Sequence, residues 1–305
     1  MTKFTKILIG VLVVGIIIVI GLMTSGLMPS VFKATTHVFT VATREGKIKP
    51  DSNVNLHSQS QTQKFKSIDD NTISNVIKTR NQHAYYKGEV ATEGHTILDI
   101  EEKDNIIKVY TIASFGYFGF ENGIFSGISG GGAPIIITFS KNEKGEYSLL
   151  EYKEPMDGAF YTDSLKKMFP EKLHDEVLSA DRYYPELTRQ QEAQAAEYLK
   201  SIGRTAKISA AYVKKKLVNI NVEASNKLFA EFSQYNQFLN NCPHWIGTSE
   251  RIENGVRYVY ETSQSKTSDD YDLITFKKKK EDGAIVEEYR YKIVGNEPVL
   301  VYKKN

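Results

Sequence analysis

Residues 106–125 read IIKVYTIASFGYFGFENGIF, and this stretch decides the fold. Ile106–Phe120 is rich in β-branched and aromatic side chains, which favour a β-strand. Asn122-Gly123 then separates Phe118-Gly119-Phe120 from Ile124-Phe125. Both turn residues tolerate positive φ angles, so the pattern predicts a tight two-residue hairpin.

Further strand patterns lie on both sides of this hairpin. Thr96–Glu101 precedes it across the turn Lys103-Asp104-Asn105, and Ala133–Ser140 and Glu146–Tyr152 follow it. The connections are too short for parallel crossovers, so the sequence predicts an antiparallel meander. Gly130-Gly131-Gly132 lacks the Gly-Lys-Ser/Thr of a phosphate-binding loop, and we interpret it as a flexible turn between strands.

Helices are expected before and after the meander. Ser67-Ile68-Asp69-Asp70 places a hydroxyl three residues before a carboxylate, a near capping box. After the meander, Asp163–Met168, Glu171–Ser179 and Glu186–Ile202 show helical spacing. The last helix has the apolar stripe Leu187, Ala195, Tyr198, Leu199 and Ile202, and we interpret its charged residues Arg189, Glu192, Glu197 and Lys200 as a solvated face.

The remainder of the chain repeats this plan. Residues 207–240 look mainly helical, with Leu228, Phe229, Phe232, Tyr235 and Leu239 spaced for one face. The strand patterns that follow are Glu250–Glu253, Val256–Gln264, Leu273–Lys280, Ala284–Val294 and Val299–Lys303. We therefore expect an α+β fold with two helix-plus-antiparallel-meander units, at 67–204 and 205–305, each a curved sheet of cystatin-like or NTF2-like form.

The N-terminus carries a strong membrane signal. Ile7–Met28, ILIGVLVVGIIIVIGLMTSGLM, is 22 residues without a charge, which as a helix is about 33 Å long against a hydrocarbon core of about 30 Å. A cleaved signal peptide is the alternative, but the apolar run is long for one and the flank Thr24–Pro29 is a poor cleavage site. We expect residues 7–28 to be an uncleaved transmembrane helix and the lipid bilayer to be a partner through it.

The segments around the span suggest its orientation. Residues 1–6 carry Lys3 and Lys6, and we place them in the cytoplasm; the long region that follows then lies outside the cell, which predicts a single-pass protein of the cell membrane. Residues 29–66 form the next segment, and 44–66 hold few apolar side chains, so we interpret 29–66 as a polar tether.

Charge and cysteine content exclude several classes of protein. Beyond residue 28, basic and acidic side chains are equal in number at 37 each, which argues against nucleic acid as a partner. The single cysteine, Cys242, rules out an intrachain disulfide and a Cys-based zinc cluster. Cys242 lies in Asn241-Cys242-Pro243-His244-Trp245, and we interpret it as a small packed residue.

No catalytic motif is complete. Ser164–Lys167 and Ser263–Lys266 both match the Ser-x-x-Lys spacing of penicillin-recognising enzymes, but the other two motifs of that fold are missing. Glu171, His174 and Asp175 could share a helix face and hold a metal, although an exposed polar face explains them better. We therefore assign no catalytic residue, no metal site and no cofactor, and expect no enzyme activity.

Two basic runs remain. Lys214–Lys216 and Lys277–Lys280 suit either contact with anionic wall polymer or lipid headgroups, or the protection of strand edges against pairing. A cell-wall or protein partner is consistent with the first interpretation.

Four segments resemble a known family. They are 113–125 (ASFGYFGFENGIF), 137–158 (ITFSKNEKGEYSLLEYKEPMDG), 190–203 (QQEAQAAEYLKSIG) and 240–247 (NNCPHWIG). Together they resemble the extracytoplasmic tail of clostridial membrane proteins in the beta-lactam sensor and antirepressor metallopeptidase family, over roughly residues 67–300. The resemblance implies a Firmicutes surface protein in signalling, and it carries no catalysis because the His-Glu-x-x-His of the peptidase is absent.

Two functions follow from these patterns. The first is a membrane-anchored extracytoplasmic sensing or binding protein. The alternative is a beta-lactam-responsive acyl-serine sensor or a degenerate relative of a membrane metallopeptidase signal transducer.

Overall fold

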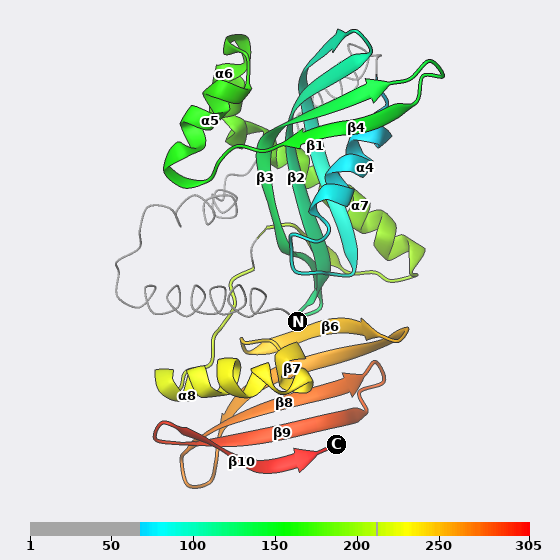
Figure 1. Ribbon diagram of the computed structural model, residues 1–305. Coiled ribbons are helices and arrows are strands. Elements are labelled where there is room, and N and C mark those ends of the chain that lie inside the picture. The colour runs from blue at the N-terminus through cyan, green and yellow to red at the C-terminus, as the bar shows by residue number, and fades with distance from the viewer. Residues whose placement is uncertain (1–67, 212) are drawn as a thin grey trace, which may run out of the picture.

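The computed structural model describes residues 68–211 and 213–305. The cytoplasmic tail, the transmembrane helix and the tether expected at 1–66 lie outside the described residues, as does Ser67 of the capping motif. Within the described ranges, no helix is both long enough and apolar enough to cross a bilayer. The described chain is α+β, with a large antiparallel sheet and a few helices, as the sequence predicts (Figure 1).

The first unit contains the expected meander. Its strands are β1 (Val90–Lys103), β2 (Ile106–Glu121), β3 (Ile124–Lys141) and β4 (Tyr147–Lys153). Each strand pairs antiparallel with the next. Asn122 and Gly123 have φ angles of 51° and 74°, so the predicted hairpin turn is confirmed.

Helix α4 (Asp70–Asn81) covers one face of this sheet. Ile73 and Ile77 are fully buried against alternate residues of β2 and β3. The predicted capping box is wrong: Asp69 is the N-cap residue, its side chain makes no capping hydrogen bond, and Asp70 is the first residue of the helix and not the third.

A second group of helices covers the other face. It comprises η2 (Gly158–Phe160), α5 (Tyr161–Met168), η3 (Glu171–Leu173), α6 (His174–Leu178), η4 (Ala180–Tyr183) and α7 (Tyr184–Ser201). Their apolar side chains pack on Tyr110, Ile112 and Phe118 of β2. Strand β2 is therefore buried on both faces, which explains why residues 106–120 are apolar without strict alternation.

The second unit is a helix layer on one five-stranded meander. The strands are β6 (Gly247–Glu253), β7 (Val256–Lys266), β8 (Asp272–Lys280), β9 (Ile285–Val294) and β10 (Glu297–Lys304). The helices are α8 (Val222–Asn226), the π-helix η5 (Lys227–Phe232) and α9 (Gln237–Asn241). Leu228 and Leu239 are buried on Tyr260 and Phe276, whereas Tyr235, expected on the same face, is 86% exposed.

The two units join at a short seam, one above the other in Figure 1. Glu121 of β2 pairs with Ser249 of β6. The Asn122 amide donates to the Thr248 carbonyl oxygen over 2.9 Å, and the Thr248 amide donates back to Asn122 Oδ1 over 2.8 Å. Strands of both units thus form one continuous sheet within the described residues.

Three further expectations need correction. Gly130–Gly132 is no turn, because it lies inside β3 and pairs with Ser114–Gly116 of β2. The segment 207–240 begins with a strand, β5 (Lys207–Ser209), which pairs parallel with β3 of the first unit although the sequence assigns it to the second.

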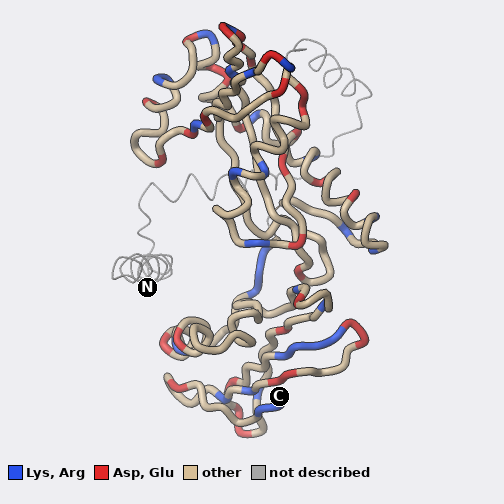
Figure 2. Tube along the Cα trace, turned by 45° about the vertical axis from the view of Figure 1, so that its right-hand side comes forward, with Lys and Arg blue, Asp and Glu red and all other residues tan. Residues whose placement is uncertain are grey.

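The third correction concerns the lysine run Lys277–Lys280. It lies in β8, between β7 and β9, so it does not protect a strand edge. Figure 2 shows this run in blue beside acidic segments. Lys278 points to one face, where it contacts Glu253, and Lys279 points to the other, where it contacts Glu261, so the run is divided between two faces.

Candidate functional site

A patch without side chains lies on the face of β2 and β3 that α7 covers. Gly116 of β2 pairs with Gly130 of β3, and Gly132 follows two residues later on the same face. A Cβ atom on Gly130 would lie 2.2 Å from the Phe115 carbonyl oxygen, and one on Gly132 would lie 2.8 Å from the Tyr184 ring. Only glycine fits here, because the backbone of β2 lies against Gly130 and the Tyr184 ring lies against Gly132.

Helix α7 presents polar side chains to this glycine patch. Tyr184, Thr188, Gln191 and Glu192 are spaced i, i+4, i+7 and i+8, so they form one stripe along the helix. They line a cavity of about 270 Å³ together with residues of β2, β3 and the segment after β5. We call it the central cavity; its other lining residues are Ser114, Phe115, Gly116, Phe118, Gly127, Ser129, Gly130, Gly131, Ala210 and Ala211.

Part of the stripe is fixed by hydrogen bonds. Tyr184 donates its hydroxyl to the Gly132 carbonyl oxygen over 3.2 Å, and Ser114 Oγ donates to Gln191 Oε1 over 3.3 Å. Glu192 Oε1 accepts the Ala210 amide over 2.9 Å. Among the described residues, nothing bonds the Thr188 hydroxyl, Gln191 Nε2 or the second Glu192 oxygen. These three groups are available to an occupant of the cavity.

The edge of β1 holds α7 in place. Gly94 allows a close approach, since a Cβ atom there would lie 2.5 Å from the Leu187 carbonyl oxygen. Gln194 Nε2 donates to the Glu93 carbonyl oxygen over 2.6 Å, and Gln190 Oε1 accepts the His95 amide over 2.9 Å. The glutamines thereby satisfy backbone groups that β1, a strand paired on one side only, would otherwise leave open.

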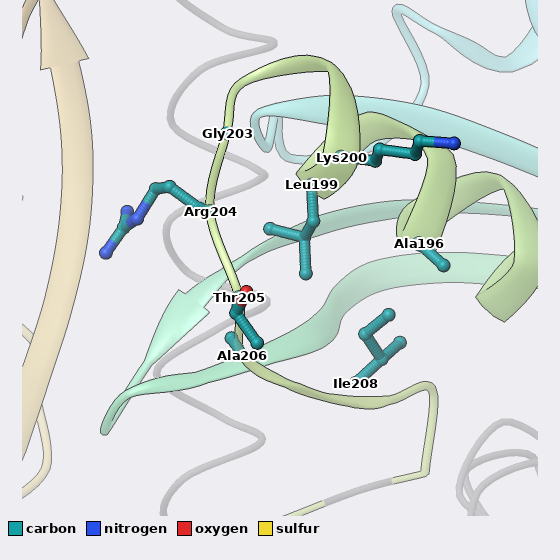
Figure 3. A pocket seen from close by; sticks show the side chains of 8 residues that line it. All are labelled: Ala196, Leu199, Lys200, Gly203, Arg204, Thr205, Ala206 and Ile208. Carbon is teal, nitrogen blue, oxygen red and sulfur yellow. The ribbon is translucent and has the colours of Figure 1, made fainter.

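A second hollow lies at the end of α7 and carries less chemistry. It has a volume of about 450 Å³ and lies between the end of α7 and the segment that leads into β5. Figure 3 shows Leu199 and Ile208 pointing into it, while Lys200 and Arg204 point away in opposite directions. Arg204 instead donates to Glu250 of β6 over 2.6 Å. Among the described residues that line this hollow, no polar side chains converge, so the central cavity is the better candidate site.

The Ser-x-x-Lys pairs have different surroundings in the structure. Ser164 on α5 is buried, and its hydroxyl donates to the Tyr161 carbonyl oxygen over 2.8 Å and accepts the Met156 amide over 2.9 Å. Lys167 is exposed. The Ser164 hydroxyl thus links α5 to the chain segment at Met156.

The second pair lies on strand β7. A spacing of three along a strand places Ser263 and Lys266 on opposite faces. Lys266 forms an ion pair with Asp272 at 3.4 Å. The structure does not bring this serine and lysine together.

The group of Glu171, His174 and Asp175, considered above for a metal, has its histidine hydrogen-bonded to the backbone. His174 Nε2 lies 3.0 Å from the Phe169 carbonyl oxygen, to which it donates. Over the described ranges, no three His, Cys, Asp or Glu side chains gather in a geometry that would hold a metal ion.

Cys242 and Trp245 are both buried in the second unit, and Cys242 belongs to its core cluster. Burial raises the pKa of the Cys242 thiol, so it stays protonated at neutral pH. Lys215, from the first basic run, has its Nζ atom 3.8 Å from the Trp245 ring centre and 2.9 Å from Glu121 of β2. Burial, followed by the Lys215 charge, lowers the pKa of neighbouring His244.

Sequence reasoning missed the central cavity, although two signals were present. Glu192 lies in the helix face interpreted as solvated, yet it faces the sheet. Gly116 lies in β2, and Gly127 and Gly130–Gly132 lie in β3, which pairs with it. Glycines gathered in two paired strands favour a close backbone approach or a hollow, and not a loop. Only the pairing of β2 with β3 shows that the glycines share one place.

Comparisons of the chain with protein-family models, curated proteins and solved structures found no match.

Proposed function

We propose that this chain is a single-pass membrane protein whose folded region lies outside the cell and binds a small ligand in the central cavity. In this proposal it acts as a sensing or binding protein and performs no catalytic step. The supporting observation is the cavity itself, where a glycine patch faces three unengaged polar groups on α7. Such a hollow with a few convergent polar groups is typical of small-molecule sites.

The location rests on the N-terminal sequence. The uncharged run Ile7–Met28 supports an anchor, and the polar residues 44–66 support a tether between the anchor and the folded region. The resemblance to the extracytoplasmic tail of the beta-lactam sensor family supports a place outside the cell. We also propose that each helix-plus-meander unit has the cystatin-like or NTF2-like form, which the helix packed on each antiparallel sheet supports.

A thermal-shift screen on the full-length protein in detergent micelles tests ligand binding. A compound at a hundred times its Kd stabilises the folded state by about 2.7 kcal/mol, a rise in Tm of several degrees for a folded region of this size. The matched variants are Gly116→Ala and Gly119→Ala. A methyl group at 116 meets Gln191 Nε2 at 3.0 Å and pushes the amide into the cavity, whereas one at 119 meets only the Ile128 side chain.

We expect compounds that raise the Tm of the wild type and of Gly119→Ala but not of Gly116→Ala. The proposal fails if no compound raises the Tm of the wild type, or if every active compound acts equally on both variants.

Cysteine labelling of whole cells tests the location. Native Cys242 is buried and gives a low background, so single cysteines can be added at Thr5 and Glu143. We expect a membrane-impermeant maleimide to label Glu143→Cys and to leave Thr5→Cys unlabelled until the cells are opened. The reverse pattern, or no labelling of either variant in intact cells, contradicts the proposed orientation.

A further inference from the structure

We propose that the central cavity selects a cationic polyol about the size of one sugar ring, with an amino group that donates to Glu192. This inference rests on the proposed function and specifies its ligand class.

The charge of the lining is negative. Glu192 is the one ionisable acid among the lining residues, and no lysine, arginine or histidine lies beside it there. An anion in this cavity would meet a carboxylate without a compensating positive charge. An ammonium group would instead form a charge-assisted hydrogen bond, which is about twice as strong as a neutral one.

The carboxylate is also oriented. The Ala210 amide holds Glu192 Oε1 at 2.9 Å, so the side chain is fixed between α7 and the segment after β5. The second oxygen carries no bond to a described residue. A ligand therefore gains a hydrogen bond without first breaking one.

The neighbouring groups suit hydroxyls. Thr188 and Gln191 lie one helical turn or less from Glu192 on the same stripe. Gln191 Nε2 can only donate, the Thr188 hydroxyl can donate or accept, and the Glu192 oxygen can only accept. A ring with adjacent hydroxyl and amino groups satisfies all three at once.

Shape and size point to a single ring. On the sheet side, Gly116 and Gly130 contribute only backbone to the lining, and the Gln191 amide lies directly over Gly116. The volume of about 270 Å³ lies just under the range of about 300–1,000 Å³ that is usual for pockets of drug-sized ligands.

Titration calorimetry on the full-length protein in detergent micelles tests the inference with three probes of equal ring size. These are glucosamine, glucose and glucuronate, which are cationic, neutral and anionic. We expect glucosamine to bind about tenfold more tightly than glucose, because its donor is charged, and glucuronate to give no binding heat.

Two variants separate the effect of the Glu192 charge from an effect on the structure of the cavity. In Glu192→Gln the amide oxygen still accepts the Ala210 amide, but the charge is gone, so glucosamine should bind no better than glucose. Glu197→Gln removes the same charge from an exposed position on α7 outside the cavity, and should keep the wild-type preference.

Three results would overturn the inference: glucuronate binding as tightly as glucosamine, an unchanged preference in Glu192→Gln, or no binding of any probe. If the probes fail while other compounds pass the Gly116→Ala test, the ligand class is wrong and the proposed function stands. If no compound passes that test, both fail.

Discussion

His95 of β1 is a buried side chain between two carboxylates. Its Nδ1 lies 2.9 Å from Glu93 Oε2, and its Nε2 lies 3.2 Å from Oδ1 of Asp70, the first residue of α4. Burial by itself lowers the pKa of the imidazole, but the hydrogen bonds to both carboxylates outweigh it and raise the pKa to about 9. A protonated His95 therefore ties α4 to the sheet at neutral pH.

Because His95 carries this proton, the free energy of unfolding should depend on pH in the alkaline range. The folded-state pKa of about 9 exceeds the 6.5 of an unperturbed histidine, so the folded state holds the proton more tightly. The stabilisation is complete below pH 6.5 and is lost as the pH rises through 9, with a size on the order of 3 kcal/mol. Urea unfolding of the wild type and of His95→Gln at pH 6, 8 and 9.5 measures it.

We expect the free energy of unfolding of the wild type to approach that of His95→Gln as the pH rises. His83→Gln changes an exposed histidine and serves as the control, with the pH dependence of the wild type. A constant difference between the wild type and His95→Gln across this range would contradict the assigned protonation.

Helix α7 is the element on which the candidate site depends. One side of it satisfies the open edge of β1 through Gln190 and Gln194, and another side lines the central cavity. At Gly94 the backbones of α7 and β1 are so close that a Cβ atom would not fit between them.

The substitution Gly94→Ala should move α7 outward. The added methyl group would lie 2.5 Å from the Leu187 carbonyl oxygen and 2.8 Å from its Cα atom, and backbone cannot yield as a side-chain tip can. We expect the free energy of unfolding to fall by about 1–3 kcal/mol, the usual cost of overpacking.

Gly119→Ala on β2 is the matched control, because its methyl group would meet only the flexible Ile128 side chain at 3.3 Å. Urea unfolding at neutral pH compares the two. Equal stability of the two variants would mean that α7 does not lie as close to β1 as described.

At the scale of the molecule, a buried ion-pair group joins the two units. Arg257 of β7 donates to Glu89, which precedes β1, over 2.8 Å, and to Glu250 of β6 over 3.0 Å. The side chains of Arg257 and Glu89 are 10% and 6% exposed. Arg204 joins the group through Glu250, with its guanidinium 3.9 Å from the centre of the Phe120 ring.

Removing the positive charge of Arg257 should weaken the contact between the two units. Arg257→Met leaves the Glu89 carboxylate buried without a positively charged partner, which typically costs about 3–5 kcal/mol. Trp245, the one tryptophan, reports on the second unit, while far-UV circular dichroism reports on the whole chain. We expect the two urea transitions to coincide in the wild type and to separate in Arg257→Met.

The control is Arg189→Met, which breaks an exposed pair with Glu186 and should cost at most about 1 kcal/mol. If Arg257→Met is no less stable than Arg189→Met, the ion-pair group does not hold the units together.

Most of the elements were predictable because their signals are local. Asn122-Gly123 and Asn254-Gly255 give hairpin turns with positive φ angles wherever they occur between strands. The helix expected at Glu186–Ile202 differs from α7 by two residues at its start and one at its end. Prediction from local sequence is wrong at Gly130–Gly132, because a glycine in a strand cannot be told from a glycine in a turn until its partner strand is known.

The sequence by itself determined the α+β class, the two meanders and the apolar face of α7, because side-chain periodicity and turn chemistry act within a few residues. The tertiary structure alone decided that Glu192 faces a glycine patch, that His95 lies between two carboxylates, and that Arg257 reaches Glu89. These contacts join residues up to 168 positions apart in the chain, and the packing of α7 and the seam between the sheets bring them together.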